Sequence, residues 1–198
     1  MSIEKLTSNI YRMTTGELIG LAKNQFLPEA IQIGIAEHPY ARAHWYLADN
    51  PGLSKKTRDL LWSDRTNRGY SLKAMLVASG HYIEEPEKYR QLYNKFPSSW
   101  NRSFWRMKRA FFGRSYAWNG GLRNGADGTP PDLLHAIYDR FYSSERRAPG
   151  NHSSWSRKTD VIDILERAGC NTELAVKIST ESDPDIRSRA FKRIVELS

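Results

Sequence analysis

The stretch from Leu27 to Gly80 contains one helical unit twice, and this repetition restricts the fold more than any other feature of the chain. A shift of 26 positions places Ile35 on Leu61 and Ala36 on Trp62. Apolar residues at three- and four-residue spacing in each copy predict short amphipathic helices. A helix pair of this size cannot bury its apolar stripe alone, so neighbouring copies must stack. The sequence therefore predicts an all-α chain of stacked helix pairs.

Further copies lie outside this stretch. Residues 171–194 form a third unit, and residues 14–24 resemble the first half of one. Thr14, with Glu17 three residues later, and Asn171 are predicted helix N-caps, because their side chains can accept from free N–H groups. Pro39, Pro51 and Pro184 each follow a predicted helix end. A proline at such a position prevents the helix from continuing.

Short phrases at the helix ends resemble those of the leucine-rich repeat variant family and of the wider HEAT-like α-solenoids. They are Ala36-Glu37-His38-Pro39, Ala48-Asp49-Asn50-Pro51 and Ser182-Asp183-Pro184-Asp185-Ile186-Arg187. The resemblance implies an α-solenoid fold that serves mainly as a binding surface. Some members of the repeat-variant family are associated with an iron–sulfur cluster on a cysteine-rich segment. This chain departs from them with a single cysteine, Cys170, so no cofactor is expected.

The charge balance favours an anionic partner. The 198 residues include 30 Lys and Arg against 22 Asp and Glu, a formal net charge of +8. Such a balance points to nucleic acid or to an acidic protein. No run approaches the roughly 18 apolar residues of a membrane span, the N-terminus lacks the apolar core of a signal peptide, and one cysteine cannot form an internal disulfide. We expect a cytoplasmic protein with no membrane or metal partner.

The segment from Trp100 to Trp118 has the most distinctive chemistry. It holds five basic residues, seven aromatic residues and no acid. On a helix, Trp100, Phe104, Met107 and Phe111 share one apolar face. Arginine rows bind phosphates and interleaved aromatics stack on bases; the alternative is a packed aromatic face and a solvated basic one. We interpret the apolar face as part of the core and the arginines as binding residues. The candidate binding residues are Arg102, Arg106, Lys108, Arg109 and Arg114.

Two segments interrupt the helical pattern. The glycine-rich loop 119–128 separates an N-terminal block, 1–118, from a C-terminal block, 129–198, in what we interpret as one continuous domain. Thr129 is the predicted cap of the next helix. Residues 143–160 are predicted to form a second, basic loop, and Gly169 to end the helix after it.

The second loop contributes another candidate group, which consists of Arg146, Arg147, Trp155, Arg157 and Lys158. A tryptophan in a Ser-rich basic loop suits a binding role as well as it suits packing in a neighbouring groove. A third group, Arg42, Arg68 and Arg187, occupies equivalent repeat positions. In the family that the repeats resemble, this arginine more often bonds to carbonyls or to an aspartate, which favours a structural role.

No motif specifies a reaction. The five histidines lack ligand-like spacing, and no nucleophile motif is present. The leading hypothesis is therefore non-catalytic binding of DNA or RNA by a basic, aromatic solenoid surface. One alternative is a protein-binding module or inhibitor with an acidic partner, including a phage-encoded or accessory factor. Another is a HEAT-like DNA glycosylase, to which the chain is similar only in architecture and composition.

Overall fold

Every regular element in the described part of the chain is a helix, which confirms the all-α prediction. The computed structural model describes residues 7–63, 69–95, 111, 128–143 and 154–198. None of the helices in these ranges is both long enough and apolar enough to span a membrane. The first elements are η1 (Ile10–Arg12), α2 (Thr15–Ala22), α3 (Glu29–Glu37), α4 (Ala41–Ala48), α5 (Lys55–Ser63) and α6 (Gly69–Ala78). The later ones are α7 (Pro86–Asn94), α9 (Pro131–Phe141), α10 (Ser154–Leu165), α11 (Thr172–Ile178) and α12 (Pro184–Leu197).

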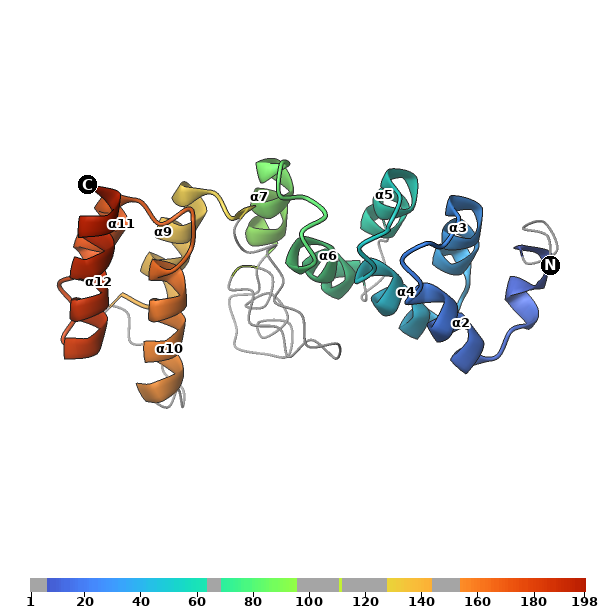
Figure 1. Ribbon diagram of the computed structural model, residues 1–198, viewed down its shortest axis with the longest axis horizontal. Helices are drawn as coiled ribbons and strands as arrows, with labels where there is room; N and C mark the ends of the chain where they lie inside the picture. Colours follow the sequence, from blue (N-terminus) through green and yellow to red (C-terminus); the bar gives the residue numbers. More distant parts are fainter. Residues whose placement is uncertain (1–6, 64–68, 96–110, 112–127, 144–153) are drawn as a thin grey trace.

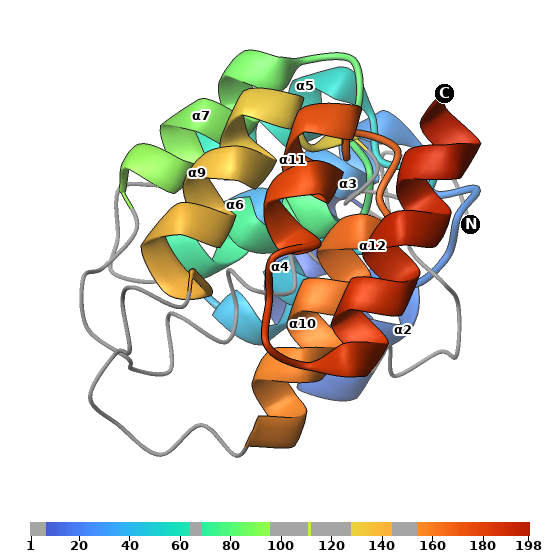
Figure 2. The same cartoon turned by 90° about the vertical axis from the view of Figure 1, so that its left-hand side faces the viewer.

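The helices form an elongated array that follows the order of the chain, with the two termini at opposite ends (Figure 1). In the first half, α2, α4 and α6 form one row and α3, α5 and α7 form the other. Within the rows, α4 packs against both α2 and α6, and α3 packs against α5. At the other end α12 packs against α10 and α11, and Figure 2 shows this end facing the viewer. Helices two apart in the chain are therefore neighbours in space.

The spacing within the first half matches the spacing in the sequence. Helix α5 begins and ends 26 residues after α3. Ile35 and Leu61, which occupy equivalent positions in these helices, are both buried. The same core extends from Ile10 in η1 to Ala190 in α12, so each helix pair covers the apolar face of the next.

Two buried amides join successive helices in the first half. Asn50 donates from Nδ2 to the carbonyls of Ala22 and Asn24, both at 2.8 Å, at the end of α2. Gln32 donates from Nε2 to the carbonyls of Leu27 and Gly52, also at 2.8 Å. Since the last carbonyls of a helix have no partner within the helix, Asn50 satisfies groups that would otherwise be buried without one.

Gly52 lies where two backbones touch. A Cβ atom at this position would be 1.9 Å from the carbonyl oxygen of Gln25. Only glycine allows this approach, because every other residue would place a side-chain atom inside the backbone of the neighbouring unit. The amide N–H of Gly52 also donates to Oδ1 of Asn50 at 2.8 Å.

Helix α6 ends in a Schellman motif at Gly80. This glycine has φ of 81°, a left-handed conformation that disfavours side chains. The amide of Gly80 donates to Val77 at 3.0 Å, and that of His81 donates to Leu76 at 3.2 Å. The turn sends the chain back past α5, where Arg58 donates to the carbonyl of His81 and to Glu85.

Polar contacts join α7 to α9. Arg90 donates to both carboxylate oxygens of Asp132, at 3.1 and 3.2 Å. The hydroxyl of Tyr93 donates to the carbonyl of Ala136 at 3.4 Å. Phe111 is buried and lies 6.4 Å, between ring centroids, from Tyr93. The prediction that Phe111 is a core residue is confirmed, whereas the rest of its predicted apolar face lies outside the described residues.

A buried carboxylate is bonded to several segments of the second half. Glu181 lies between α11 and α12 and is 3% exposed. It accepts from the hydroxyl of Tyr138 on α9 and from Arg157 on α10, the latter at 2.6 Å. Arg157 also donates to the carbonyl of Tyr142. One carboxylate therefore connects three segments of the C-terminal half.

Several predicted helix boundaries are correct and others are not. Thr14 and Glu17 form a capping box, and Asn171 caps α11. Thr129 is not a cap, because Pro130 occupies the N-cap position of α9. Helix α10 ends at Leu165, before Gly169, and a Cβ on Gly169 would lie 2.5 Å from the carbonyl oxygen of Thr129. Gly169 is thus required for close packing and does not cap a helix.

Candidate functional site

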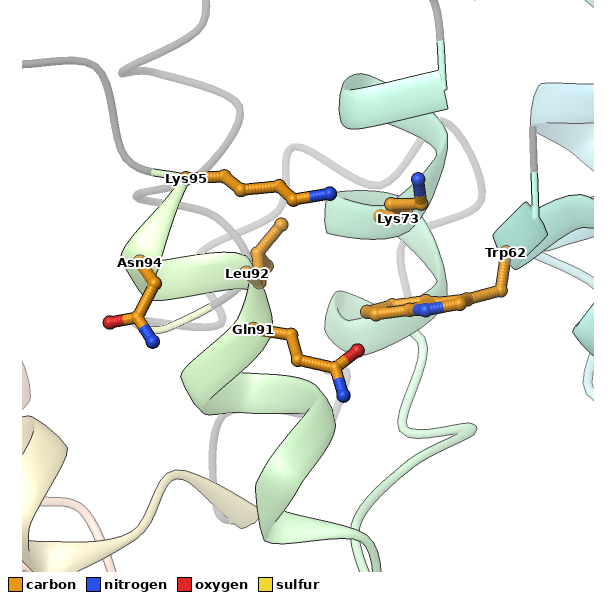
Figure 3. A pocket seen from close by; sticks show the side chains of 6 residues that line it. All are labelled: Trp62, Lys73, Gln91, Leu92, Asn94 and Lys95. Carbon is orange, nitrogen blue, oxygen red and sulfur yellow. The ribbon is translucent and has the colours of Figure 1, made fainter. Parts of the chain in front are cut away.

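A hollow of about 280 Å³ lies where α5, α6 and α7 meet. Figure 3 shows Trp62 reaching from α5 into the space between α6 and α7, with the side chains of Lys73 and Lys95 on the rim. The hollow is near the lower end of the size range of small-ligand pockets, about 300 Å³. Its described lining consists of Trp62, Lys73, Gln91, Leu92, Asn94 and Lys95.

Neighbouring side chains hold the indole ring of Trp62 in place. The ring of Tyr82 meets it edge-on, with 4.9 Å between centroids and an interplanar angle of 68°. The ammonium group of Lys88 lies 4.7 Å from the indole centroid, and that of Lys73 lies 5.9 Å from it. Both distances fall within the range of cation–π attraction. The hollow therefore contains an aromatic ring whose position is fixed by contacts on more than one side.

The rim combines positive charge with neutral amides. Lys73 and Lys95 bring ammonium groups to it from α6 and α7, and Gln91 and Asn94 add amides from α7. None of the described residues that line the hollow is acidic. An anion at this rim would gain electrostatic energy, and the amides can both donate and accept hydrogen bonds.

The residues behind Trp62 make this part of the fold rigid. The guanidinium of Arg58 lies 4.5 Å from the centroid of the Tyr82 ring and is paired with Glu85 at 2.8 Å. Burial raises the pKa of Tyr82 well above its ordinary value, so the phenol stays neutral. The pKa of His81 is lowered to about 4, mainly by burial and in part by the nearby Arg58 charge, while a hydrogen bond to the carbonyl of Ala48 opposes the shift.

No protein-family model, curated protein or solved structure matches this chain. The resemblance to leucine-rich repeat variants and HEAT-like solenoids therefore stays a prediction from short motifs. The function is inferred from the hollow and from the charges around it.

Most of the sequence-predicted binding residues lie outside the described residues. This is true of Arg102, Arg106, Lys108, Arg109 and Arg114 in the basic-aromatic segment, and of Arg146 and Arg147 in the second basic segment. Their role in binding remains a prediction. The hollow is close to the first of these groups in the chain, because Lys95 precedes Trp100 by only five positions.

The remaining three candidates lie at the start of a helix. Helix α10 begins at Ser154, so Trp155, Arg157 and Lys158 are helical, where the sequence predicts a loop up to residue 160. Arg157 is paired with Glu181, and Lys158 is paired with Asp183 at 3.5 Å and with Asp185. These contacts stabilise the first turn of α10, and they give both cations intramolecular partners whether or not they also bind a ligand.

Two of the three equivalent repeat arginines, Arg187 and Arg42, lie within the described residues. Arg187 donates to the carbonyls of Glu181 at 3.0 Å and of Ser182 at 2.7 Å, which is the structural role that the repeat pattern predicts. Arg42 is exposed on α4. Arg68 lies outside the described residues.

The described histidines have structural hydrogen bonds. His44 bonds through Nε2 to the carbonyl of His38 at 2.8 Å, and His81 bonds to the carbonyl of Ala48 at 3.1 Å. His135 bonds to the cap residue Asn171 at 3.0 Å. Across the described ranges, no three His, Cys, Asp or Glu side chains come close enough together to hold a metal ion.

Sequence reasoning missed the hollow because its residues come from three helices. Trp62, Lys73 and Lys95 are separated by 11 and 22 positions, and only the packing of α5, α6 and α7 brings them together. One signal was available. The repeat places Trp62 where the preceding copy has Ala36, and a large aromatic at a position that holds a small residue in the neighbouring unit indicates a local specialisation.

Proposed function

We propose that this chain is a non-catalytic nucleic-acid-binding protein built as an α-solenoid of the leucine-rich repeat variant or HEAT-like kind. The observation that carries the proposal is the hollow at α5–α7, where Trp62 stands beside lysines and the described lining has no acid. Nucleic acids offer the two groups that such a site recognises, a phosphate for the lysines and a planar base for the indole.

The solenoid part of the proposal is supported by the spacing of the helices. Helices α3 and α5 occur at an interval of 26 residues, and α4 packs between α2 and α6. Stacked helix pairs of this kind present extended binding surfaces. The hollow lies along such a surface and is formed by consecutive units, so a linear ligand could contact several units at once.

The charge distribution supports a polyanionic ligand. Residues 96–127 carry six Lys and Arg against one acid and thus account for most of the +8 net charge. This cluster follows Lys95 directly in the chain. A ligand with repeated negative charges can use the hollow and the basic segment together, whereas a single anion would use only one of them.

The test is the salt dependence of binding. The triple change R102A/R106A/R109A should weaken binding to a short labelled oligonucleotide and reduce the slope of log K against log salt by about one for each lost phosphate contact. The matched control is K177A/R189A/K192A, which removes three exposed cations from α11 and α12. Equal effects of both triples would show that only total charge matters. No binding by the wild-type chain at low salt would contradict the proposal and leave the protein-partner alternative.

A further inference from the structure

We infer that the hollow between α5, α6 and α7 takes one unpaired base, stacked on Trp62, and that the chain therefore prefers single-stranded to double-stranded nucleic acid. The inference rests on the proposed function and specifies the form of the ligand. The geometry that points to it is an indole, held by its neighbours, that reaches into a hollow whose rim carries lysines and amides.

The indole of Trp62 is pre-organised for stacking. Tyr82 packs against it edge-on at 4.9 Å, and Arg58 in turn packs on Tyr82 at 4.5 Å. Arg58 is held by Glu85 and by the carbonyl of His81. Because this chain of contacts fixes the ring before a ligand arrives, binding a base would cost little side-chain entropy at Trp62.

Lys88 and Lys73 both place an ammonium group over the indole, and a base can displace that of Lys73, which is the more distant one. The ammonium group of Lys73 is 5.9 Å from the indole centroid, near the outer limit of cation–π attraction. Such a contact is weak at an exposed site, whereas a base stacked on an aromatic side chain changes the affinity by about fivefold to a hundredfold. Stacking is therefore the stronger interaction, and the displaced ammonium would remain near the phosphate of the same nucleotide.

The rest of the lining suits the other parts of a nucleotide. Lys95 lies on the rim opposite Lys73 (Figure 3), in reach of the same phosphate. Gln91 and Asn94 present amides that can pair with donors or acceptors on the edge of a base. Leu92 is buried beneath them and gives the hollow an apolar floor. One nucleotide therefore satisfies the aromatic, basic and amide groups together.

Base pairing would prevent this mode of binding. In a duplex both faces of each base are covered by its neighbours, so Trp62 could reach a base only after that base leaves the stack. The free-energy cost of unstacking and unpairing is comparable to the whole gain from one stacked base. A duplex would consequently bind through its phosphates alone, while a single strand would use both contacts.

An acidic peptide fits the hollow less well than a nucleotide. Carboxylates could pair with Lys73 and Lys95, but they offer no planar group for the indole. Binding of a peptide would depend on charge and would be insensitive to the shape of residue 62. Polyglutamate is therefore a suitable probe for separating charge from stacking.

The experiment compares two substitutions at one position. Fluorescence anisotropy would measure binding of the wild type, W62F and W62L to a labelled single strand, to its duplex and to labelled polyglutamate. Leucine keeps an apolar side chain but removes the ring, and phenylalanine keeps a smaller ring. We expect W62L to weaken single-strand binding about tenfold, W62F to retain most of it, and duplex and polyglutamate binding to change less than about twofold.

Controls separate the possible failures. Thermal unfolding must show that each variant is folded. If W62L is not, the wild type provides the comparison, because stacking on Trp62 predicts tighter binding of a single strand than of its duplex, and equal affinity for the two would overturn the inference. If W62L weakens single-strand, duplex and polyglutamate binding equally, or none of them, the stacking inference is overturned while the proposed function stands. If the wild type binds neither form of nucleic acid, the proposed function itself fails.

Discussion

The two halves of the molecule join their helices with different chemistry. In residues 7–95 the connecting polar side chains that are fully buried are neutral amides, with Asn50 bonded to the end of α2 and Gln32 bonded to the carbonyl of Gly52, although Arg58 and Glu85 add an ion pair. In residues 128–198 the buried connecting side chain is a carboxylate, Glu181, which is bonded to Arg157; the half-exposed pair of Lys177 and Asp139, at 2.6 Å, adds a second ionic contact. Short helices in the same arrangement can thus be connected either by buried amides or by ion pairs.

Several cations of the two halves also differ in their partners, although the first half has ion pairs of its own, such as Arg58 with Glu85 and Arg90 with Asp132. In the second half, Arg157, Lys177 and Arg189 each face a carboxylate, which cancels most of their field. In the first half, Lys23 lies 4.7 Å from the ring of Tyr46, and Lys88 lies the same distance from that of Trp62. A cation on an aromatic ring keeps its net charge. The first half is therefore better suited to attract an anion, although both halves contain many basic residues.

The largest expected effect is at the ionic connection. The change E181A should destabilise the fold by about 3 kcal/mol, at the low end of the range for breaking a buried pair, because the Arg157 side chain is 31% exposed and can reach water. Chemical denaturation monitored by circular dichroism would measure this loss. The control E196A removes a carboxylate that is 47% exposed and should cost less than about 1 kcal/mol. Equal losses would mean that the buried connection has no special role.

A smaller loss is expected at the amide connection. The change N50A leaves the carbonyls of Ala22 and Asn24 without their partner, and unsatisfied buried polar groups cost about 1–3 kcal/mol. We expect about 2 kcal/mol in total, since water can reach part of this turn. The control Q25A removes an exposed amide nearby and should be almost neutral. If the N50A variant were as stable as the wild type, the hydrogen bonds of Asn50 would not stabilise the first half, and the two halves would differ in more than the type of bond.

An effect of similar size to that of N50A is a pH dependence located in the first half. His81 has its pKa lowered to about 4 by burial, whereas in the unfolded chain it is about 6.5. As the pH falls below 6.5 the unfolded state takes up a proton that the folded state does not, so stability is complete above pH 7 and declines towards pH 4.

Between pH 7 and pH 5 this contribution amounts to about 2 kcal/mol. The variant H81Q, which retains a donor for the carbonyl of Ala48, should lose less stability than the wild type over this interval. Denaturation at both pH values would measure the difference. Parallel pH profiles for the two proteins would assign the acid sensitivity to other groups.

Local sequence patterns predicted the helices well and their contacts poorly. The capping box at Thr14 and Glu17 and the cap at Asn171 were predicted correctly, because a cap depends on residues within one turn. The predicted loop up to residue 160 was too long. The first turn of α10 is stabilised by Lys158 with Asp185 and by Arg157 with Glu181, over separations of 27 and 24 residues. No local pattern contains such contacts.

The candidate site, like the contacts of α10, could not be predicted from local sequence patterns. Its residues are unremarkable individually, since lysines and amides on exposed helix faces are common. Only the packing of α5 against α6, and of α6 against α7, places Lys73 and Lys95 beside Trp62. The buried tyrosines that support the site, such as Tyr82, also resemble ordinary core residues in the sequence. The contact of Tyr82 with Arg58 depends on the turn at Gly80.

The contact between Gly52 and Gln25 has a consequence for the geometry of the whole array. Side-chain packing is adjustable, because a substitution in a core can be absorbed by small shifts of its neighbours. Two peptide backbones in direct contact cannot approach further. Gly52 and Gln25 therefore act as a fixed spacer between the unit that contains α2 and α3 and the unit that contains α4 and α5. This spacer sets the pitch of the first half, and with it the distance over which a bound strand would have to extend from one unit to the next.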